Sequence, residues 1–149
     1  MKMIDVGAKE RTERVAVARG FVGMAPATVR IVRRGESEKG DVIAAARLAG
    51  VMAAKRTPEL VPLCHPIALS GVEVEARPRA GGVEIVATVR TVDRTGVEME
   101  ALAAVAAGCL TVYDMLKRYE RGMRIEEIVL LEKKGGRSGH WRRGRRTGR

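Results

Sequence analysis

The strongest pattern in the chain lies at residues 95–117, where hydrophobic positions recur on two faces at helical spacing. One face is apolar throughout and is expected to pack on the core: Leu102, Val105, Cys109, Val112, Leu116 and Tyr119. The other face is small and apolar until it ends in two charges: Ala103, Ala107, Leu110, Asp114 and Lys117. A solvent-facing helix surface is normally charged and polar. The pattern therefore predicts a helix over about 97–119 that packs on both sides, so that Asp114 and Lys117 do not simply face water.

Other segments predict the remaining elements. Alternating residues predict strands at 27–33, 71–77, 83–92 and 124–132, with the middle two joined as a hairpin. A helix is predicted at 41–55, with Asp41 as its N-cap and Gly50 at a close packing contact, and Gly122 is expected to end the long helix. The order strand, helix, strand, strand, helix, strand is that of the ferredoxin-like α+β fold, an antiparallel sheet with both helices on one face.

Three segments fall outside this pattern. Residues 1–20 are polar without sustained periodicity, which indicates a flexible arm or a segment ordered by a partner or ligand. Residues 56–67 contain three prolines yet are apolar, which is typical of a shaped loop beside a binding site. Residues 140–149 are expected to form a disordered basic tail. We therefore expect a single domain over residues 1–139.

Composition narrows the class of protein. Aromatic residues make up 3% of the chain and hydrophobic residues 46%, so the core must be aliphatic. The net charge is +10, but six arginines after residue 134, with no acid among them, leave +4 for the rest. No apolar run reaches the roughly eighteen residues that a membrane span needs, no secretory signal is present, and two cysteines make no disulfide framework. A soluble cytoplasmic protein without membrane attachment is expected.

Two classes compete with an enzyme. The positive charge favours a nucleic-acid-binding module, but the strands lack the aromatic pair on which an RNA-recognition sheet stacks bases. Binding driven by charge alone would fall steeply with salt and would be lost on deletion of residues 140–149. A purely structural oligomer is the third class. We favour the enzyme because of the residues described next.

The sharpest local motif is Leu63-Cys64-His65-Pro66 in the proline-rich loop. His65 is suited to general acid or base chemistry near neutral pH, and a histidine that bonds a loop carbonyl is an equally good interpretation. A nucleophilic Cys64–His65 pair is disfavoured because adjacent residues of an extended segment point in opposite directions. The histidines and cysteines show no zinc-ligand spacing, so no resident metal is expected.

Charged residues at element ends suggest further chemistry. Asp114 and Lys117 share a helix face, either as a surface ion pair or as an acid–base pair in a dry cleft. Glu98 and Glu100 either compensate the helix dipole or accept hydrogen bonds from a guanine-like edge. Basic residues at loop and element ends are either solvated or converge on a polyphosphate: Arg14, Lys39, Lys55, Lys133, Lys134 and Arg137. The glycine-rich residues 135–139 suit an anion with low specificity.

Five segments in order resemble one family closely: KGDV at 39–42, AAKRT at 53–57, LVPLCHPI at 60–67, TGVEMEAL at 95–102 and LTVYDMLK at 110–117. The family is the molybdenum cofactor biosynthesis protein C family of cyclic pyranopterin monophosphate synthases. The resemblance implies the ferredoxin-like fold, a homohexamer built as a trimer of dimers, and an active site at each dimer interface. It implies no cofactor, and the basic end after residue 139 has no counterpart in the family.

The resemblance also implies a substrate and a set of site residues. The substrate is a small molecule derived from GTP, 3′,8-cyclo-7,8-dihydroguanosine 5′-triphosphate, which is converted to cyclic pyranopterin monophosphate and diphosphate. Asp114 matches the catalytic aspartate, and Lys117 and Lys39 match its catalytic partners. The positions that match substrate contacts are Arg14, Lys55, Leu63, Cys64, His65, Glu98, Met99, Glu100 and Lys133. Proton transfers fall to the Asp114 group, and Arg14, Lys55 and Lys133 are expected around the leaving diphosphate.

Overall fold

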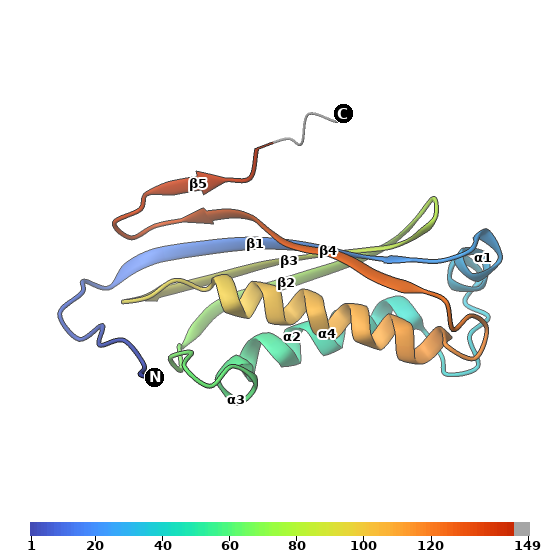
Figure 1. Cartoon of the computed structure of the whole chain (residues 1–149), viewed down its shortest axis with the longest axis horizontal. Helices are drawn as coiled ribbons and strands as arrows, with labels where there is room; N and C mark the ends of the chain where they lie inside the picture. The colour runs from blue at the N-terminus through green and yellow to red at the C-terminus, as the bar shows by residue number, and fades with distance from the viewer. Residues whose placement is uncertain (145–149) are drawn as a thin grey trace.

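A computed structural model describes residues 1–144 as an antiparallel sheet with its two long helices on one face (Figure 1). The strands are β1 Thr12–Gly23, β2 Leu69–Arg79, β3 Gly82–Asp93, β4 Arg124–Lys134 and β5 His140–Arg142, in the order β2-β3-β1-β4-β5. The helices are α1 Pro26–Arg34, α2 Val42–Lys55, α3 Thr57–Leu60 and α4 Glu98–Leu116. The first four strands with α2 and α4 form the predicted ferredoxin-like α+β arrangement.

Helix α2 and the β2–β3 hairpin confirm the sequence pattern. The Asp41 carboxylate caps α2 by accepting the Ala44 N–H at 2.9 Å, as expected for an N-cap residue. Gly50 is buried where α2 crosses α4, and a Cβ there would lie 3.0 Å from the Ala104 carbonyl oxygen. Gly81 turns the hairpin at a φ of +80°. The two helices therefore pack closely because Gly50 has no side chain.

Helix α4 was predicted to reach Tyr119 and ends instead at Leu116. The Tyr119 N–H bonds the Leu116 carbonyl oxygen at 2.8 Å, which tightens the chain into a turn. The Tyr119 hydroxyl accepts the Glu38 N–H at 2.9 Å, and the Tyr113 hydroxyl donates to the Arg121 carbonyl at 2.8 Å. These bonds hold the departing chain in place before Gly122 is reached.

The prediction of a strand at residues 27–33 is wrong, because this segment is helix α1. Pro26 occupies the first turn, where its fixed φ suits a helix, and Gly35 ends the helix at a φ of +65°. The alternation of β-branched residues concealed a helical face on which Val29 and Val32 are buried. The residues that start and end the helix therefore determine the structure of this segment, although its β-branched composition favours a strand.

The first strand is β1, so residues 12–20 do not belong to a flexible arm. On β1, Ala16, Ala18 and Gly20 face the helices, and these small residues hide the alternation on which strand prediction depends. A Cβ on Gly20 would lie 2.5 Å from Val105 Cγ1 of α4. The central strand is therefore small-sided because α4 lies directly against it.

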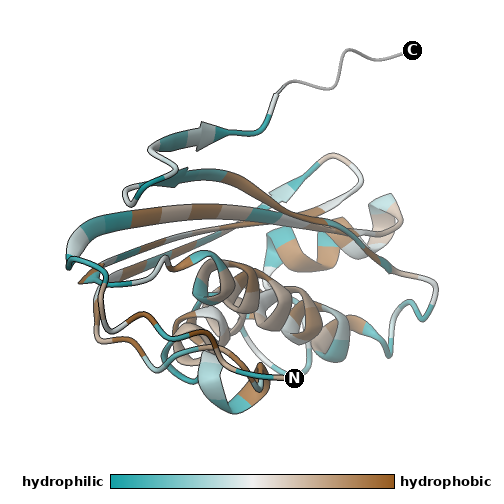
Figure 2. Ribbon diagram, turned by 60° about the vertical axis from the view of Figure 1, so that its left-hand side comes forward, coloured by the Kyte–Doolittle hydropathy of each residue, from teal (hydrophilic) through white to brown (hydrophobic). Residues whose placement is uncertain are grey.

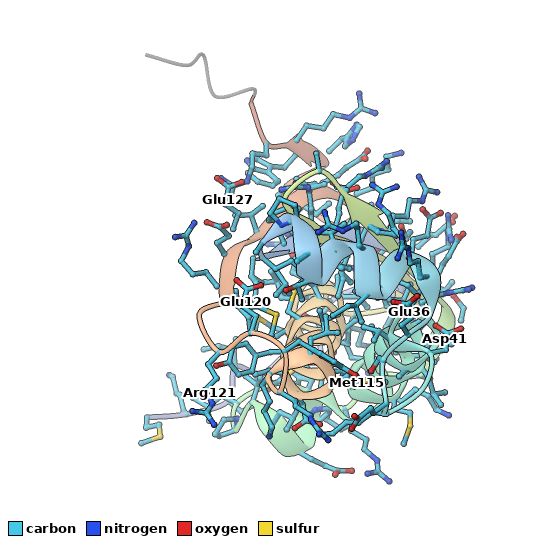
Figure 3. All side chains as sticks on the ribbon, turned by 90° about the vertical axis from the view of Figure 1, so that its right-hand side faces the viewer. Glu36, Asp41, Met115, Glu120, Arg121 and Glu127 are labelled. Carbon is cyan, nitrogen blue, oxygen red and sulfur yellow. The ribbon has the colours of Figure 1, made fainter. Side chains whose placement is uncertain are left out.

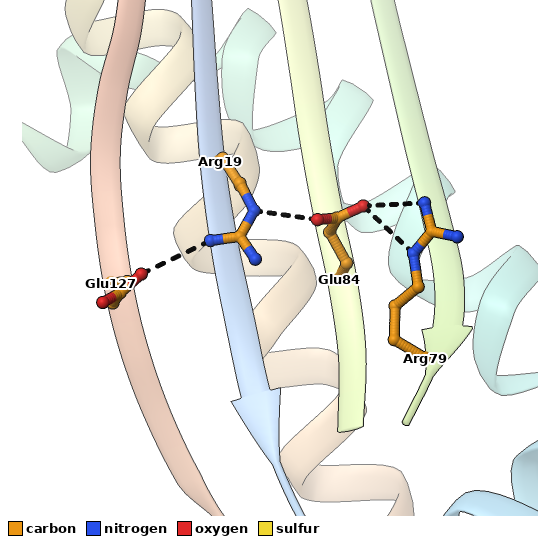
Figure 4. Close-up of polar contacts among 4 residues, drawn as sticks. All are labelled: Arg19, Arg79, Glu84 and Glu127. Carbon is orange, nitrogen blue, oxygen red and sulfur yellow. Dashed lines mark hydrogen bonds and ion pairs between the residues drawn. The ribbon is translucent and has the colours of Figure 1, made fainter. Parts of the chain in front are cut away.

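Two faces of the sheet differ in character. The helix-covered face holds the aliphatic core, which includes Val22, Ile85, Val89 and Leu116, and α4 is mainly hydrophobic along its length (Figure 2). On the open face, ion pairs cross four strands, from Glu127 through Arg19 and Glu84 to Arg79 (Figure 4). The Arg19 guanidinium beside Glu84 lowers the pKa of that carboxyl. This face is polar and internally paired.

The remaining segments qualify the sequence predictions. Residues 57–60 of the proline-rich segment form α3, and the rest is a loop. Residues 140–142 form β5 against β4, so they are not a disordered tail, and residues 145–149 lie outside the described residues. Contrary to expectation, α4 is long and apolar enough for a membrane span, but half of that window is buried against the sheet and α2.

Candidate active site

The C-terminal end of α4 carries a cluster of three charged side chains, here called the lysine–aspartate cluster. Asp114 Oδ2 lies 2.7 Å from Lys39 Nζ, and Asp114 Oδ1 lies 2.7 Å from Lys117 Nζ. Lys39 also donates to the Asp114 carbonyl oxygen at 3.2 Å. Figure 3 views this end and labels Met115 in the last turn of α4, with Glu36 and Asp41 to its right. The three residues that the resemblance marks as catalytic lie together.

The cluster is ionised and open to solvent in the single chain. Hydrogen bonds from Lys117 and Lys39 lower the pKa of Asp114 to about 2, and the bond to Asp114 raises the pKa of Lys117. About half of each side chain is exposed. The expectation of a dry cleft is therefore not met within one chain, although the charge arrangement suits proton transfer.

A second cluster lies at the N-terminal end of α4, where Glu100 is only 2% exposed. Cys64 Sγ donates to Glu100 Oε1 at 3.5 Å, and Oε2 is buried without a partner among the described residues. Burial, with Glu98 nearby, raises the pKa of Glu100. Burial, with Glu100, raises the pKa of the Cys64 thiol to about 11, so Cys64 stays protonated and is a poor nucleophile.

Beside this end of α4 lies a pocket of about 720 Å³, here called the hairpin pocket. Its lining includes Arg14 of β1, Glu98 of α4 and Lys133 of β4, all predicted site residues. Lys133 pairs with Glu98, and each side chain is about a quarter exposed. Arg14 donates from Nε to the Asp93 carbonyl at 3.2 Å. The structure thus brings these three predicted residues to one place.

The proline-rich loop reaches the same end of the molecule. His65 Nε2 lies 2.7 Å from the Ile4 carbonyl oxygen, a bond of the kind that the structural interpretation of this histidine anticipated. Leu63 is 45% exposed and Met99 is 40% exposed. The side chain of Lys55, the last residue of α2, makes no hydrogen bond or ion pair within residues 1–144. These residues are accessible to a ligand, and Lys55 does not line the hairpin pocket.

An apolar groove of about 480 Å³ runs along the exposed side of α4, between its two ends. It is lined by Leu60, Val61, Met99, Leu102, Ala103, Ala106, Ala107, Leu110 and Ile128. Leu110, the last α4 residue along the groove, is 61% exposed. The second face of α4 is thus small and apolar, as the sequence indicated, but no part of residues 1–144 covers it.

The two groups of predicted site residues are far apart in one chain. Glu98 and Asp114 are separated by sixteen residues of α4, which at the rise of an α-helix corresponds to about 24 Å. The structure therefore places the predicted site residues in two groups, here called the half-sites, one at each end of the same helix.

Sequence reasoning missed Lys9 and Thr12, which also line the hairpin pocket. Arg137, which the sequence offered as a possible polyphosphate contact, lines it as well, together with Ser138 and the Gly136 backbone. The glycine-rich run at 135–139 indicated this part of the pocket, since an anion site can be built from backbone N–H groups. Within residues 1–144, no group of three or more His, Cys, Asp or Glu side chains is arranged to hold a metal ion.

A family model described as the MoaC family matches residues 3–136, which include both half-sites. The chain belongs to the MoaC family. A protein of Thermomicrobium roseum named cyclic pyranopterin monophosphate synthase is 60% identical over 95% of this chain and 87% of its own length. A protein of Methylobacterium sp. strain 4-46 with the same name is 58% identical over 93% of this chain and 88% of its own length.

The family match covers every site residue that the resemblance implies. It ends at Gly136, so Arg137, Ser138 and β5 lie beyond the matched range.

Proposed function

We propose that this chain is a cyclic pyranopterin monophosphate synthase of molybdenum cofactor biosynthesis, acting in the cytoplasm. Its substrate is 3′,8-cyclo-7,8-dihydroguanosine 5′-triphosphate, and its products are cyclic pyranopterin monophosphate and diphosphate, which makes it a lyase. The observation that carries the proposal is the Lys39–Asp114–Lys117 arrangement, because two independent elements hold it in place. The family match and the names of the relatives support the same activity.

The lysine–aspartate cluster is suited to the proton transfers of ring opening and reclosure. Asp114, ionised with a pKa of about 2, holds two ammonium groups 2.7 Å from its two carboxylate oxygens. A lysine that donates a proton to a nitrogen or oxygen of the substrate becomes neutral. The Asp114 carboxylate then favours the return of a proton to that lysine, because it stabilises the ammonium form. Which lysine acts at each step is part of the proposal.

The other half-site is suited to the phosphates and the purine-derived ring. Formation of the cyclic monophosphate requires a substrate hydroxyl to attack the α-phosphorus, while the bond to the β-phosphate breaks and diphosphate leaves. Arg14 and Lys133 line the hairpin pocket and can stabilise the charge of the leaving group. Glu100, with one unpartnered carboxyl oxygen, is placed to accept an N–H of the ring.

We further propose that two chains complete each site by pairing α4 in antiparallel orientation. A twofold axis between Ala106 and Ala107 would set Leu110 against the partner subunit's Ala103, with small residues that allow close approach. The same pairing would set Asp114 against the partner subunit's Met99. The apolar groove supports this arrangement, since such exposed patches mark interaction sites. Each site then draws one half from each chain, and three such dimers form the hexamer.

The test of the activity is direct. The purified protein is incubated with the cyclised triphosphate, and the products are followed by mass spectrometry and phosphorus NMR. We expect stoichiometric cyclic pyranopterin monophosphate and diphosphate. GTP, which lacks the bond between C3′ and C8, serves as the matched control and should give neither product. A folded protein that leaves the authentic substrate unchanged would overturn the proposed function.

A further inference from the structure

We infer that the loop of the β4–β5 hairpin is a diphosphate clamp, in which Arg137 and Ser138 bind the β- and γ-phosphates together with Lys9. None of these three residues is among those that the family resemblance marks for the site. The inference rests on the proposed function for the identity of the ligand. The inference is supported by the residues that line the hairpin pocket and by the backbone of the loop.

The hairpin pocket collects cationic side chains from separate parts of the chain. Lys9 comes from the segment before β1, Arg14 from β1, Lys133 from β4 and Arg137 from the hairpin loop. The carboxylates of Glu10 and Glu98 also line it, so the cations outnumber the acids by two. An excess of positive charge in a pocket of about 720 Å³ favours a compact polyanion.

The cations differ in how far they are already engaged. Lys133 is paired with Glu98, and Arg14 is held by the carbonyl oxygens of Asp93 and Arg94 at 3.2 and 3.3 Å. In contrast, the side chains of Arg137 and Lys9 are exposed and make no hydrogen bond or ion pair with residues 1–144. The engaged residues are held in position, whereas the two unengaged ones have all their donors available for a ligand.

The backbone of the loop brings the clamp onto Arg14. Gly135 and Gly136 have φ values of +94° and +75°, which favour glycine. A Cβ on Gly136 would lie 2.3 Å from Arg14 Nη1, so a larger residue at position 136 would displace the guanidinium. The Gly139 N–H bonds the Gly136 carbonyl at 3.1 Å and closes the turn that presents Arg137 and Ser138.

Two further features of the pocket lack a partner in the single chain. Thr12 lines it, and its hydroxyl oxygen is buried without a hydrogen bond among residues 1–144. Helix α4 begins beside Gly96 with no side chain capping its N-terminus. A buried hydroxyl and an uncapped helix start both favour an anion, since each supplies a donor that water or a ligand must satisfy. Diphosphate carries acceptor oxygens on two phosphorus atoms, so it fits a site whose hydrogen-bond donors come from several directions.

The test measures binding of inorganic diphosphate to the full-length protein by titration calorimetry, apart from turnover. A guanidinium bonded to a phosphate contributes enough that Arg137→Ala should raise the Kd about 10- to 100-fold. Arg137→Lys keeps the positive charge but loses the planar guanidinium with its paired N–H donors. Its affinity for diphosphate should therefore lie between those of Arg137→Ala and the parent. Ser138→Ala should raise the Kd about 3- to 10-fold. The matched control is Arg124→Ala, which removes an exposed arginine at the other end of β4.

Unfolding temperatures show whether each variant is folded. If Arg137→Ala leaves the Kd within twofold of the parent, or if Arg124→Ala raises it equally, the clamp is wrong whatever the turnover. If Arg137→Ala weakens diphosphate binding but the parent protein converts no substrate, the clamp stands and the proposed function falls. If turnover is normal, Arg137→Ala should also raise the KM for the triphosphate, and an unchanged KM contradicts the inference.

Discussion

At its C-terminal end, α4 presents Asp114 to solvent between two lysines, whereas at its N-terminal end it holds Glu100 in a nearly dry site. The first carboxylate is 53% exposed in its side chain, fully paired and of lowered pKa. The second is 2% exposed, has an oxygen without a partner, and has a raised pKa. One helix therefore carries a fully paired charge cluster at one end and, at the other, a buried carboxyl with an oxygen that lacks a donor among residues 1–144.

The contrast indicates a division of labour between the two ends. A paired, ionised cluster requires little reorganisation to move protons, and its geometry does not depend on a ligand. A buried carboxyl with an open acceptor oxygen is costly until something donates to it, which is typical of a recognition group. Four experiments test this contrast, beginning with the largest expected effect.

Asp114→Ala should lower kcat by about 10²- to 10⁴-fold, the usual contribution of a positioned acid–base group, while substrate still binds. Loss of the carboxylate leaves Lys39 and Lys117 facing each other without their common partner. Steady-state kinetics and equilibrium binding of the substrate measure the two effects. Glu36→Ala, which removes an exposed acid at the same end of the molecule, is the control and should behave as the parent.

Ala107→Glu should break the pairing of chains, because it places a charge at the centre of the apolar groove. We expect dissociation in sedimentation experiments and a loss of activity of about tenfold or more, because each half-site is incomplete alone. Ala80→Glu, an identical substitution in the exposed β2–β3 turn, should change neither property. A fully active variant of unchanged mass would exclude the proposed α4 pairing.

Glu100→Gln should stabilise the unliganded protein above neutral pH. The folded-state pKa of Glu100 lies above its unfolded value, so the folded protein binds the proton more tightly. Stability is therefore lost as pH rises from the unfolded pKa through the folded pKa, and glutamine avoids this loss. We expect a gain in Tm of about 3 °C at pH 8 that vanishes at pH 4. A gain in Tm that is larger at pH 4 than at pH 8 would show that burial does not raise the pKa of Glu100.

Lys117→Ala and Lys39→Ala should each return the pKa of Asp114 part of the way from about 2 toward 3.8. Lys117 should have the larger effect, because its hydrogen bond is the main cause of the shift. Carboxyl carbon titration by NMR measures the change. Since the cluster is half exposed, we expect little change in stability at pH 7. A pKa that stays near 2 in both variants would show that neither lysine causes the shift.

Sequence pattern predicted α2, α4, the β2–β3 hairpin and β4, because their hydrophobic residues are large and regularly spaced. It missed β1, whose helix-facing positions are Ala16, Ala18 and Gly20, since small residues give no hydrophobic alternation. It also misplaced the first strand onto α1, where Pro26 and Gly35 outweigh the β-branched residues between them. Side chains that must be small for packing are therefore the ones that pattern fails to detect.

The site was predictable only in part, for a similar reason. Helical spacing placed Asp114 beside Lys117, but only the fold brings Lys39 to the same carboxylate. The hairpin pocket depends on β1 and on the turn after β4, and both were assigned no regular structure from the sequence. The roles of the site residues remain predictions that the variants above address.

The distance of about 24 Å along α4 between the two half-sites has a consequence for mixtures of variants. One parent carries Asp114→Ala and the other carries Arg137→Ala, and each alone has two damaged sites per dimer. In the proposed α4 pairing, a mixed dimer formed by subunit exchange gathers both lesions into one site and leaves the other site intact. Two impaired proteins should therefore complement each other, in a test tube or in a cell that expresses both.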